Sequence, residues 1–362
     1  MKLPRGQGRF VLVAFAVLLL LLGTAVWYTT AVPGERHRGP LPPLDPGDVP
    51  LVPRLEAHVV AVASEEHNVG NAEALERSAR YIETTLTGFG YAVARQEFAA
   101  EGVKVRNLEV VISAPRASAR RLVVIGAHYD SAQGAVGADD NGSGVAVLLE
   151  LARGLRSFQP TIGLELRLVF YVNEELPWFE TENMGSYVHA SGLAREGSEV
   201  VAMLSLESIG WYAGEPRSQH YPFPFNLFYP STGDFIGFVA NPRSRELLRR
   251  VVGSFRRHAA FPSEGGVALE SIPGVSWSDQ WAYWKFGWPA VMVTDTAPFR
   301  NPHYHTLRDT PDTLDYDRLA RVLKGLEGVV RELAAPPDSL TALARRRFQI
   351  LAVHEQFLRD SL

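Results

Sequence analysis

Short apolar runs alternate along this chain with segments whose apolar residues recur at helical spacing. The runs are rich in β-branched and aromatic residues, which is typical of buried strands. The predicted strands are 105–113, 122–127, 164–172, 200–206 and 290–294. Helical periodicity predicts helices over 71–87, which has an Asn at its start, and over 144–156. Strands separated by helices predict an α/β domain with a largely parallel sheet covered on both faces.

The longest apolar run, residues 10–28, lies near the N-terminus and carries no charge. A run of about 19 residues is long enough to cross a bilayer as a helix. Basic residues precede it and aromatic residues close it, at Lys2, Arg5, Arg9, Trp27 and Tyr28. This pattern predicts a single-pass anchor within residues 1–31 of a cell-membrane protein, with everything after residue 30 outside the cytoplasm. A signal peptide cleaved near Thr29-Thr30-Ala31 is the main alternative, and a buried core helix is a weaker one.

The rest of the chain divides by composition. Seven prolines between residues 32 and 54 predict an extended, semi-rigid linker. Residues 55–335 hold the alternating pattern and form the predicted main folded domain, and 336–362 are expected to form an Arg-rich C-terminal helical tail. Within the domain, 211–239 is rich in aromatics, Pro and Gly without a clear period, which suits a lid or pocket wall and equally a surface loop.

Charge and cysteine content exclude several classes of function. The formal net charge of −4 comes with no basic stripe, so we expect no nucleic-acid partner. The chain has no cysteine, which excludes disulfides, thiolate metal sites and cysteine nucleophiles. The oligomeric state stays open.

Side chains of the metal-ligand type follow the apolar runs. Two histidines and three carboxylates form this set: His128, Asp140, Glu175, Glu207 and His305. Such a set suits two zinc ions that share a bridging carboxylate. Several of these residues follow the carboxyl ends of predicted strands, where α/β sheets bind ligands. Each residue alone also has a structural explanation, as a buried histidine, a turn or cap residue, or a solvated glutamate pair.

Neighbouring residues suggest supporting roles. Asp130 lies two residues after His128, so in an extended segment it projects to the same side and could orient the imidazole. Glu174 is spare beside Glu175 and could act as the general base. Tyr304 could donate a hydrogen bond to a developing oxyanion or merely pack. From spacing alone, either His303 or His305 could bind metal.

Six motifs in order carry a resemblance to a known family: GAHYDS, GADDNGSG, the Glu174-Glu175 pair, the SLE turn, SDQWAYWKFGWPAV and YHTLRDT. Together they resemble the co-catalytic dizinc aminopeptidases of the bacterial leucyl aminopeptidase type, over about residues 55–335. Glutamate carboxypeptidases belong to that family, and animal glutaminyl cyclases are related to it. The resemblance implies a three-layer α/β/α domain with a mixed, largely parallel central sheet.

The resemblance also implies roles for individual residues. The two Zn²⁺ ions would be held by His128, Asp140 as the bridge, Glu175, Glu207 and His305, and Glu174 would be the general base. Asp130 would orient the first histidine and Tyr304 would assist the carbonyl, whereas His303 has no role. Two positions depart from the family pattern: Glu207 stands where Asp is usual, and Gln280 replaces a His that is not a ligand.

We therefore expect a membrane-anchored metallo-aminopeptidase that hydrolyses the N-terminal bond of peptides, with catalysis outside the cytoplasm. The alternatives are a glutaminyl cyclase-like acyltransferase, which needs one zinc and a closed pocket, and a non-catalytic receptor or scaffold on the same fold. A carboxypeptidase is a further possibility, because side-chain specificity resides in loops that one sequence does not decode.

Overall fold

The computed structural model describes residues 5–100, 102–113 and 121–335. Its centre is one eight-stranded sheet in the order β1-β2-β4-β3-β5-β8-β6-β7. The central pairs β4/β3, β3/β5 and β5/β8 are parallel, as is β6/β7, while β1/β2, β2/β4 and β8/β6 are antiparallel. The strands are β1 Ala94–Ala100, β2 Val103–Ser113, β3 Arg121–His128, β4 Leu164–Tyr171, β5 Glu199–Glu207, β6 Ile236–Ala240, β7 Ser263–Val267 and β8 Ala290–Thr294.

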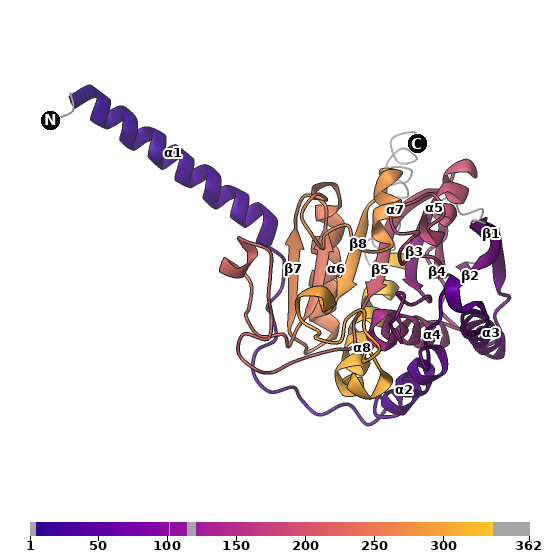
Figure 1. The fold of residues 1–362 in the computed structure, drawn as a ribbon. Helices are drawn as coiled ribbons and strands as arrows, with labels where there is room; N and C mark the ends of the chain where they lie inside the picture. The colour runs from indigo at the N-terminus through magenta and orange to yellow at the C-terminus, as the bar shows by residue number, and fades with distance from the viewer. Residues whose placement is uncertain (1–4, 101, 114–120, 336–362) are drawn as a thin grey trace, which may run out of the picture.

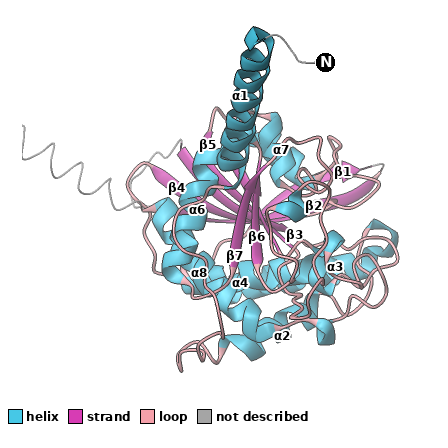
Figure 2. Cartoon of the chain, turned by 90° about the vertical axis from the view of Figure 1, so that its left-hand side faces the viewer, coloured by secondary structure: helices cyan, strands magenta, loops and turns pink. Residues whose placement is uncertain are grey.

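Helices cover both faces of this sheet. One core cluster joins one face to α2, α3, α4, α6 and α8, and a second joins the other face to α5 and α7. Figure 2 shows the strands between α2, α4 and α8 on one side and α7 on the other. The helices are α2 Leu51–Val62, α3 Ala72–Gly88, α4 Gly144–Gly154, α5 Gly185–Arg195, α6 Arg245–His258, α7 Gln280–Lys285 and α8 Tyr316–Ala334. The three-layer α/β/α architecture with a mixed, largely parallel sheet is confirmed.

The N-terminal helix α1, Arg5–Thr30, projects away from this domain (Figure 1). Its segment Val13–Thr30 has a mean hydropathy of 2.0, and none of it is buried. A core helix is therefore excluded as its explanation. The length and composition suit a membrane anchor and a signal sequence alike.

Two predicted segments differ from the structure. Helix α2 begins at Leu51, so the last residues of the expected linker belong to the folded domain. Strand β6 begins at Ile236, so the aromatic stretch 211–239 ends in the sheet and is irregular only before it, apart from a short turn of helix at Phe225–Leu227. The expected C-terminal helical tail, 336–362, lies outside the described residues.

Candidate metal centre

The carboxyl ends of three adjacent strands meet at one edge of the sheet. His128 is the last residue of β3, Glu207 is the last residue of β5, and Glu174 and Glu175 follow the end of β4. The register pairs His128 with Tyr171, so β3 and β4 end side by side. Because parallel strands end at a common edge, residues distant in sequence converge there.

The five predicted ligands form two groups of three that share Asp140. In one, the Nε2 atom of His128 lies 3.2 Å from Oδ1 of Asp140 and 3.3 Å from Oε2 of Glu207. In the other, Nε2 of His305 lies 3.0 Å from Oδ2 of Asp140 and 3.3 Å from Oε1 of Glu175. Within each group the ligand atoms lie within 4.8 Å of one another. The two oxygens of Asp140 thus face different groups, which is the geometry of a bridging carboxylate.

The donor atoms themselves indicate that this centre fits a cation. The buried atoms His128 Nε2, Asp140 Oδ1 and Glu175 Oε1 have no hydrogen-bond partner. Buried polar atoms without partners are costly in a folded protein, and carboxylates more so. Imidazole and carboxylate donors at this spacing are a suitable set for zinc, which would satisfy all three.

The electrostatics of the centre agree with this need for positive charge. Burial acts to lower the pKa of His305, but Asp140 and Glu175 outweigh it and raise that pKa to about 10. For Glu175 itself, burial and then the charge of Asp140 raise the pKa to about 7. The protein without metal therefore gathers protons at the site where bound cations would compensate the carboxylates.

Asp130 contacts both His128 and the backbone of the glutamate pair. The Nδ1 atom of His128 lies 3.0 Å from the backbone carbonyl of Asp130 and 3.7 Å from its side-chain carboxylate. The carboxylate oxygens instead accept the backbone N–H groups of Glu174 and Glu175, both at 3.2 Å. The backbone carbonyl of Asp130 is therefore nearer to the ring than its carboxylate is. Asp130 thus fixes both the first histidine and the glutamate pair.

Glu174 lies beside the predicted ligands and belongs to neither group of three. Its Oε2 atom is 3.9 Å from Nε2 of His128, and the side chain is buried. Burial raises the pKa of Glu174 well above its ordinary value, opposed by His128 and supported by Glu175. A free carboxylate with a raised pKa suits a group that accepts a proton during the reaction.

Three residues that the sequence analysis did not assign hold this centre in place. Asp309 accepts the backbone N–H groups of Asp139 and Asp140, at 2.9 and 3.2 Å. The carboxylate of Asp139 in turn accepts the N–H of Gly210 at 2.9 Å. Ser278 donates its hydroxyl hydrogen to Oε2 of Glu207 at 2.7 Å. Asp309 and Ser278 both lie inside motifs of the family resemblance, which was the available signal.

Gln280, which stands where the family pattern has a His, makes no hydrogen bond with Glu207. Its amide donates to the carbonyl of Val275 at 3.0 Å, and Ser278 rather than Gln280 contacts Glu207. The amide oxygen of Gln280 is buried without a hydrogen-bond partner, so only the nitrogen end of this side chain is satisfied. The second departure, Glu207, has both carboxylate oxygens held by hydroxyls, Oε2 by Ser278 and Oε1 by Ser208 at 2.8 Å.

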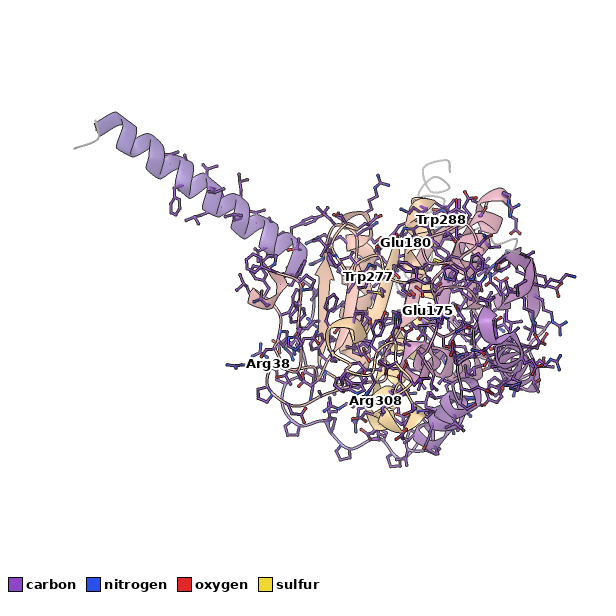
Figure 3. All side chains as sticks on the ribbon, in the orientation of Figure 1. Arg38, Glu175, Glu180, Trp277, Trp288 and Arg308 are labelled. Atoms are coloured by element: carbon purple, nitrogen blue, oxygen red, sulfur yellow. The ribbon has the colours of Figure 1, made fainter. Side chains whose placement is uncertain are left out.

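An apolar pocket with a cavity volume of about 130 Å³, partly open to solvent, adjoins the candidate metal centre. Glu207 and Tyr304 lie at the metal end. Most other lining residues are aromatic or aliphatic and come from 221–229, 235–239, 272–277 and 292–299. In the view of Figure 3, Trp277 of this lining lies between Glu175 and the side of the domain from which α1 projects. The predicted excursion 211–239 therefore forms a pocket wall.

The structure also shows the contacts of Tyr304 and of the histidines on either side of it, His303 and His305. The Tyr304 ring stacks on His305 with ring centroids 3.8 Å apart. Burial, followed by the charge of Asp140, raises the pKa of Tyr304, so its hydroxyl stays protonated and can donate. His305, and not His303, contacts Asp140 and Glu175.

Residues 109–330 match peptidase family M28. The protein YfbL of Escherichia coli is 39% identical over 271 residues, which cover 71% of this chain and 80% of YfbL. A probable leucine aminopeptidase of Trichophyton verrucosum is 28% identical over 255 residues, 66% of this chain and 62% of that protein. This chain therefore spans somewhat less than two thirds of the fungal relative's length.

Three solved structures share the fold at low sequence identity. An aminopeptidase from Aneurinibacillus sp. strain AM-1 has a TM-score of 0.58 at 16% identity, covering 80% of this chain and 96% of its own. A Zn-dependent exopeptidase from Parabacteroides distasonis has a TM-score of 0.57 at 20% identity, covering 82% and 100%. A glutaminyl cyclase from Fimbriiglobus ruber has a TM-score of 0.57 at 19% identity, covering 83% and 99%. The family match spans more than half of the chain, and with the similarity to YfbL it shows that this chain belongs to peptidase family M28.

Proposed function

We propose that this protein is a zinc-dependent aminopeptidase that removes the N-terminal residue of peptides with a free amine. The observation that supports it most is the pair of ligand groups sharing Asp140, with Glu174 free beside them and an apolar pocket adjoining. The leucine aminopeptidase among the sequence relatives supports the same activity. The two zinc ions, the roles of the residues and the substrate class are all part of this proposal.

His128, Asp140 and Glu207 would hold one zinc ion, and Asp140, Glu175 and His305 the other. When bound, zinc supplies Lewis-acid polarisation of the scissile carbonyl and makes water nucleophilic near neutral pH. Glu174 would accept the proton of the attacking water and deliver it to the leaving amine. The Tyr304 hydroxyl would donate a hydrogen bond to the carbonyl oxygen as negative charge develops on it.

The pocket indicates which first residues are accepted. Its walls are formed mainly by aromatic and aliphatic side chains, and Tyr304 and Glu207 mark the end where the bond is cut. An apolar side chain transferred from water into such a pocket gains free energy in proportion to the apolar area that it buries. Leucine-sized and aromatic first residues should therefore be preferred to small or charged ones.

The test uses the full chain in detergent and a peptide mixture with free, acetylated and N-terminal Gln ends, followed by mass spectrometry with and without chelator. Stepwise loss of first residues from the free-amine peptides only, stopped by chelator and restored by zinc, is the expected result. Loss of ammonia from the Gln peptides would favour a glutaminyl cyclase-like acyltransferase instead. Binding of metal without any turnover would favour a non-catalytic scaffold, and release from the carboxyl end a carboxypeptidase.

We also propose that α1 is a single-pass anchor and that the peptidase domain, residues 55–335, works outside the cytoplasm. The supporting observations are the unburied apolar segment Val13–Thr30 and the basic residues before it. Peptide substrates would then be met at the outer surface of the cell membrane.

A further inference from the structure

A row of four residues crosses the sheet from the metal centre to its outer edge. The register pairs Glu207 of β5 with Thr294 of β8, Thr294 with Gly237 of β6, and Gly237 with Glu264 of β7. Residues paired in register point to the same face of a sheet, and three spacings of roughly 4.8 Å put the two glutamate Cα atoms about 14 Å apart. All four residues line the apolar pocket. The pocket is thus a trough with a carboxylate at each end.

Thr294 and Gly237 leave space between the two glutamates, because threonine is small and glycine has no side chain. Tyr221 and Tyr229 lie close enough to Glu264 for its charge to act on both phenols. An unpaired carboxylate at this end would be a strong attraction for a cationic side chain in an otherwise apolar space.

The partner of Glu264 comes from the segment between α1 and α2. The Nη1 atom of Arg36 lies 2.7 Å from Oε1 of Glu264, and Nη2 lies 3.5 Å from Oδ1 of Asp234. Both side chains of the close pair are largely shielded from solvent, with exposures of 25% for Arg36 and 19% for Glu264. Burial raises the pKa of Glu264, and Arg36, followed by Arg256, acts against that rise.

The backbone around Arg36 is held against the domain. Arg256 donates to the carbonyl oxygens of Pro33 at 3.3 Å and Gly34 at 2.7 Å. Val32 lies against Gly265 on the α6 side of β7, whereas Arg36 reaches Glu264 on the pocket side. Figure 1 shows the chain passing from α1 along β7, the edge strand of the sheet. Residues 32–36 therefore wrap this edge and bring Arg36 to Glu264, which lines both the apolar pocket and the open groove beside it where Arg36 lies.

We propose that Arg36 is a specificity-determining residue, which pairs with Glu264 at the far end of the pocket and so keeps the pocket selective against cationic first residues. This inference rests on the proposed aminopeptidase activity. Without Arg36, the Glu264 carboxylate would be free to pair with the ammonium or guanidinium group of a lysine or arginine substrate. Arg256 would compensate only in part, since its guanidinium is engaged by Ser263 and by the two backbone carbonyls.

The experiment compares kcat/KM for Leu-, Lys- and Arg-aminomethylcoumarin with the full chain in detergent, loaded with zinc. Arg36→Gln should raise the Lys/Leu ratio at least about tenfold, an effect of the size that one charge pair has on discrimination. Arg36→Lys keeps the cation and should stay near the wild-type ratio. Arg80→Gln removes the same charge from an exposed position of α3 and should leave the ratio unchanged.

A second variant tests whether Glu264 is the group involved. In Arg36→Gln combined with Glu264→Gln, the ratio should return towards the wild-type value, because no carboxylate is left to bind the substrate cation. An unchanged ratio in Arg36→Gln, with leucine hydrolysis retained, would overturn the inference, as would a raised ratio that persists in the double variant. Failure of the wild type to hydrolyse any of the three substrates would instead overturn the proposed function, and the inference with it.

Discussion

At the scale of single residues, the centre depends on adjacent carboxylates that have different surroundings. Glu175 contacts His305 and belongs to a ligand group, whereas Glu174 belongs to neither. The carboxylate of Asp130 accepts the backbone N–H groups of Glu174 and Glu175, and the two glutamate side chains lie at different positions beside the centre. A difference of one residue therefore separates the proposed base from a proposed ligand.

Substitution of the pair should separate these roles. Glu174→Gln should keep the metal content and lower kcat by at least about 10²-fold, because only the proton acceptor is lost. Glu175→Gln, the matched control, should reduce the bound metal, since it removes a ligand oxygen. Metal content by mass spectrometry and kcat on a leucine substrate check both variants. Turnover close to that of the wild type in Glu174→Gln would contradict the assignment.

At the scale of elements, α4, which follows the turn of Asp140 in the chain, is joined to α2 through one buried charge. Glu150 on α4 lies 3.1 Å from Nε of Arg54 and 3.3 Å from Nε2 of His58, both on α2, and 2.9 Å from Nη2 of Arg153. Burial acts to raise the pKa of Glu150, but His58 and Arg153 outweigh it and lower that pKa to about 2. A carboxylate with a depressed pKa stabilises the folded state above its unfolded pKa and loses that effect as the pH falls.

The free energy of unfolding should therefore decrease as the pH is lowered, because Glu150 becomes protonated. With a pKa of about 2 when folded and 4.5 when unfolded, Glu150 should contribute a loss of about 2 kcal/mol between pH 6 and pH 3. Denaturant titrations of the metal-free protein at several pH values measure it. Glu150→Gln should be less stable at pH 6 and show a correspondingly shallower fall, whereas the exposed Glu246→Gln should follow the wild type. Parallel curves for Glu150→Gln and wild type would refute the assignment.

The start of α5 depends on a glycine, Gly185, which lies close to the end of β4. A Cβ atom added at Gly185 would lie 2.3 Å from the carbonyl oxygen of Val172 and 2.4 Å from Oδ1 of Asn107. The N–H of Gly185 donates to that same Val172 carbonyl at 2.8 Å, so the helix starts tight against the end of β4. The segment that follows the glutamate pair is thereby attached to the sheet.

Gly185→Ala should destabilise the protein by at least about 2 kcal/mol, because the added methyl meets backbone that cannot move easily. Thermal unfolding measures the loss. Gly88→Ala at the end of α3, where nothing lies within 4 Å of the added atom, is the control and should leave Tm within a degree or so. Equal Tm values for Gly185→Ala and wild type would show that the contact relaxes without cost.

At the scale of the whole molecule, the segment after α1 joins the proposed anchor to the peptidase domain. Arg245 donates to the Tyr28 carbonyl at 2.9 Å and lies over the Tyr28 ring, and Arg249 donates to the Ala31 carbonyl at 2.6 Å. With the contacts of residues 32–36, these bonds fix the end of α1 beside α6 and β7. The predicted linker is therefore a segment bound to the domain surface rather than a free tether.

If α1 is a retained anchor, the full chain with an N-terminal tag should pellet with membranes, resist alkaline carbonate and keep its tag. A chain shortened to begin at Val32 should stay in the soluble fraction and remain active, because it keeps the whole peptidase domain, and it should keep the wild-type Lys/Leu ratio because it keeps Arg36. Cell fractionation and immunoblotting measure this. Soluble full-length protein without its tag would identify α1 as a cleaved leader instead.

The sequence alone determined the α/β class, five of the strands and the helices α1, α3 and α4, and it predicted the eight candidate site residues. Apolar runs predict strands directly, and ligand-type residues at their ends indicate a site because parallel strands end together. Strands β1, β6 and β7 were not predicted. Of these, Ile236–Ala240 and Ser263–Val267 are short and contain glycine, which weakens the strand signal. Helices α6 and α8 do have helical periodicity, and the prediction omitted them.

Only the tertiary structure decided which atoms meet. That Asp130 binds the glutamate pair through its side chain, that Ser278 and Asp309 hold Glu207 and Asp140, and that Arg36 reaches Glu264 all depend on segments that pack together from distant parts of the chain. The sequence pattern records the polarity of each position and the spacing of the apolar residues, and these predict helices and strands. It does not record the register between strands, and that register is what places Glu264, the partner of Arg36, at one end of the pocket and Glu207 of the candidate metal centre at the other.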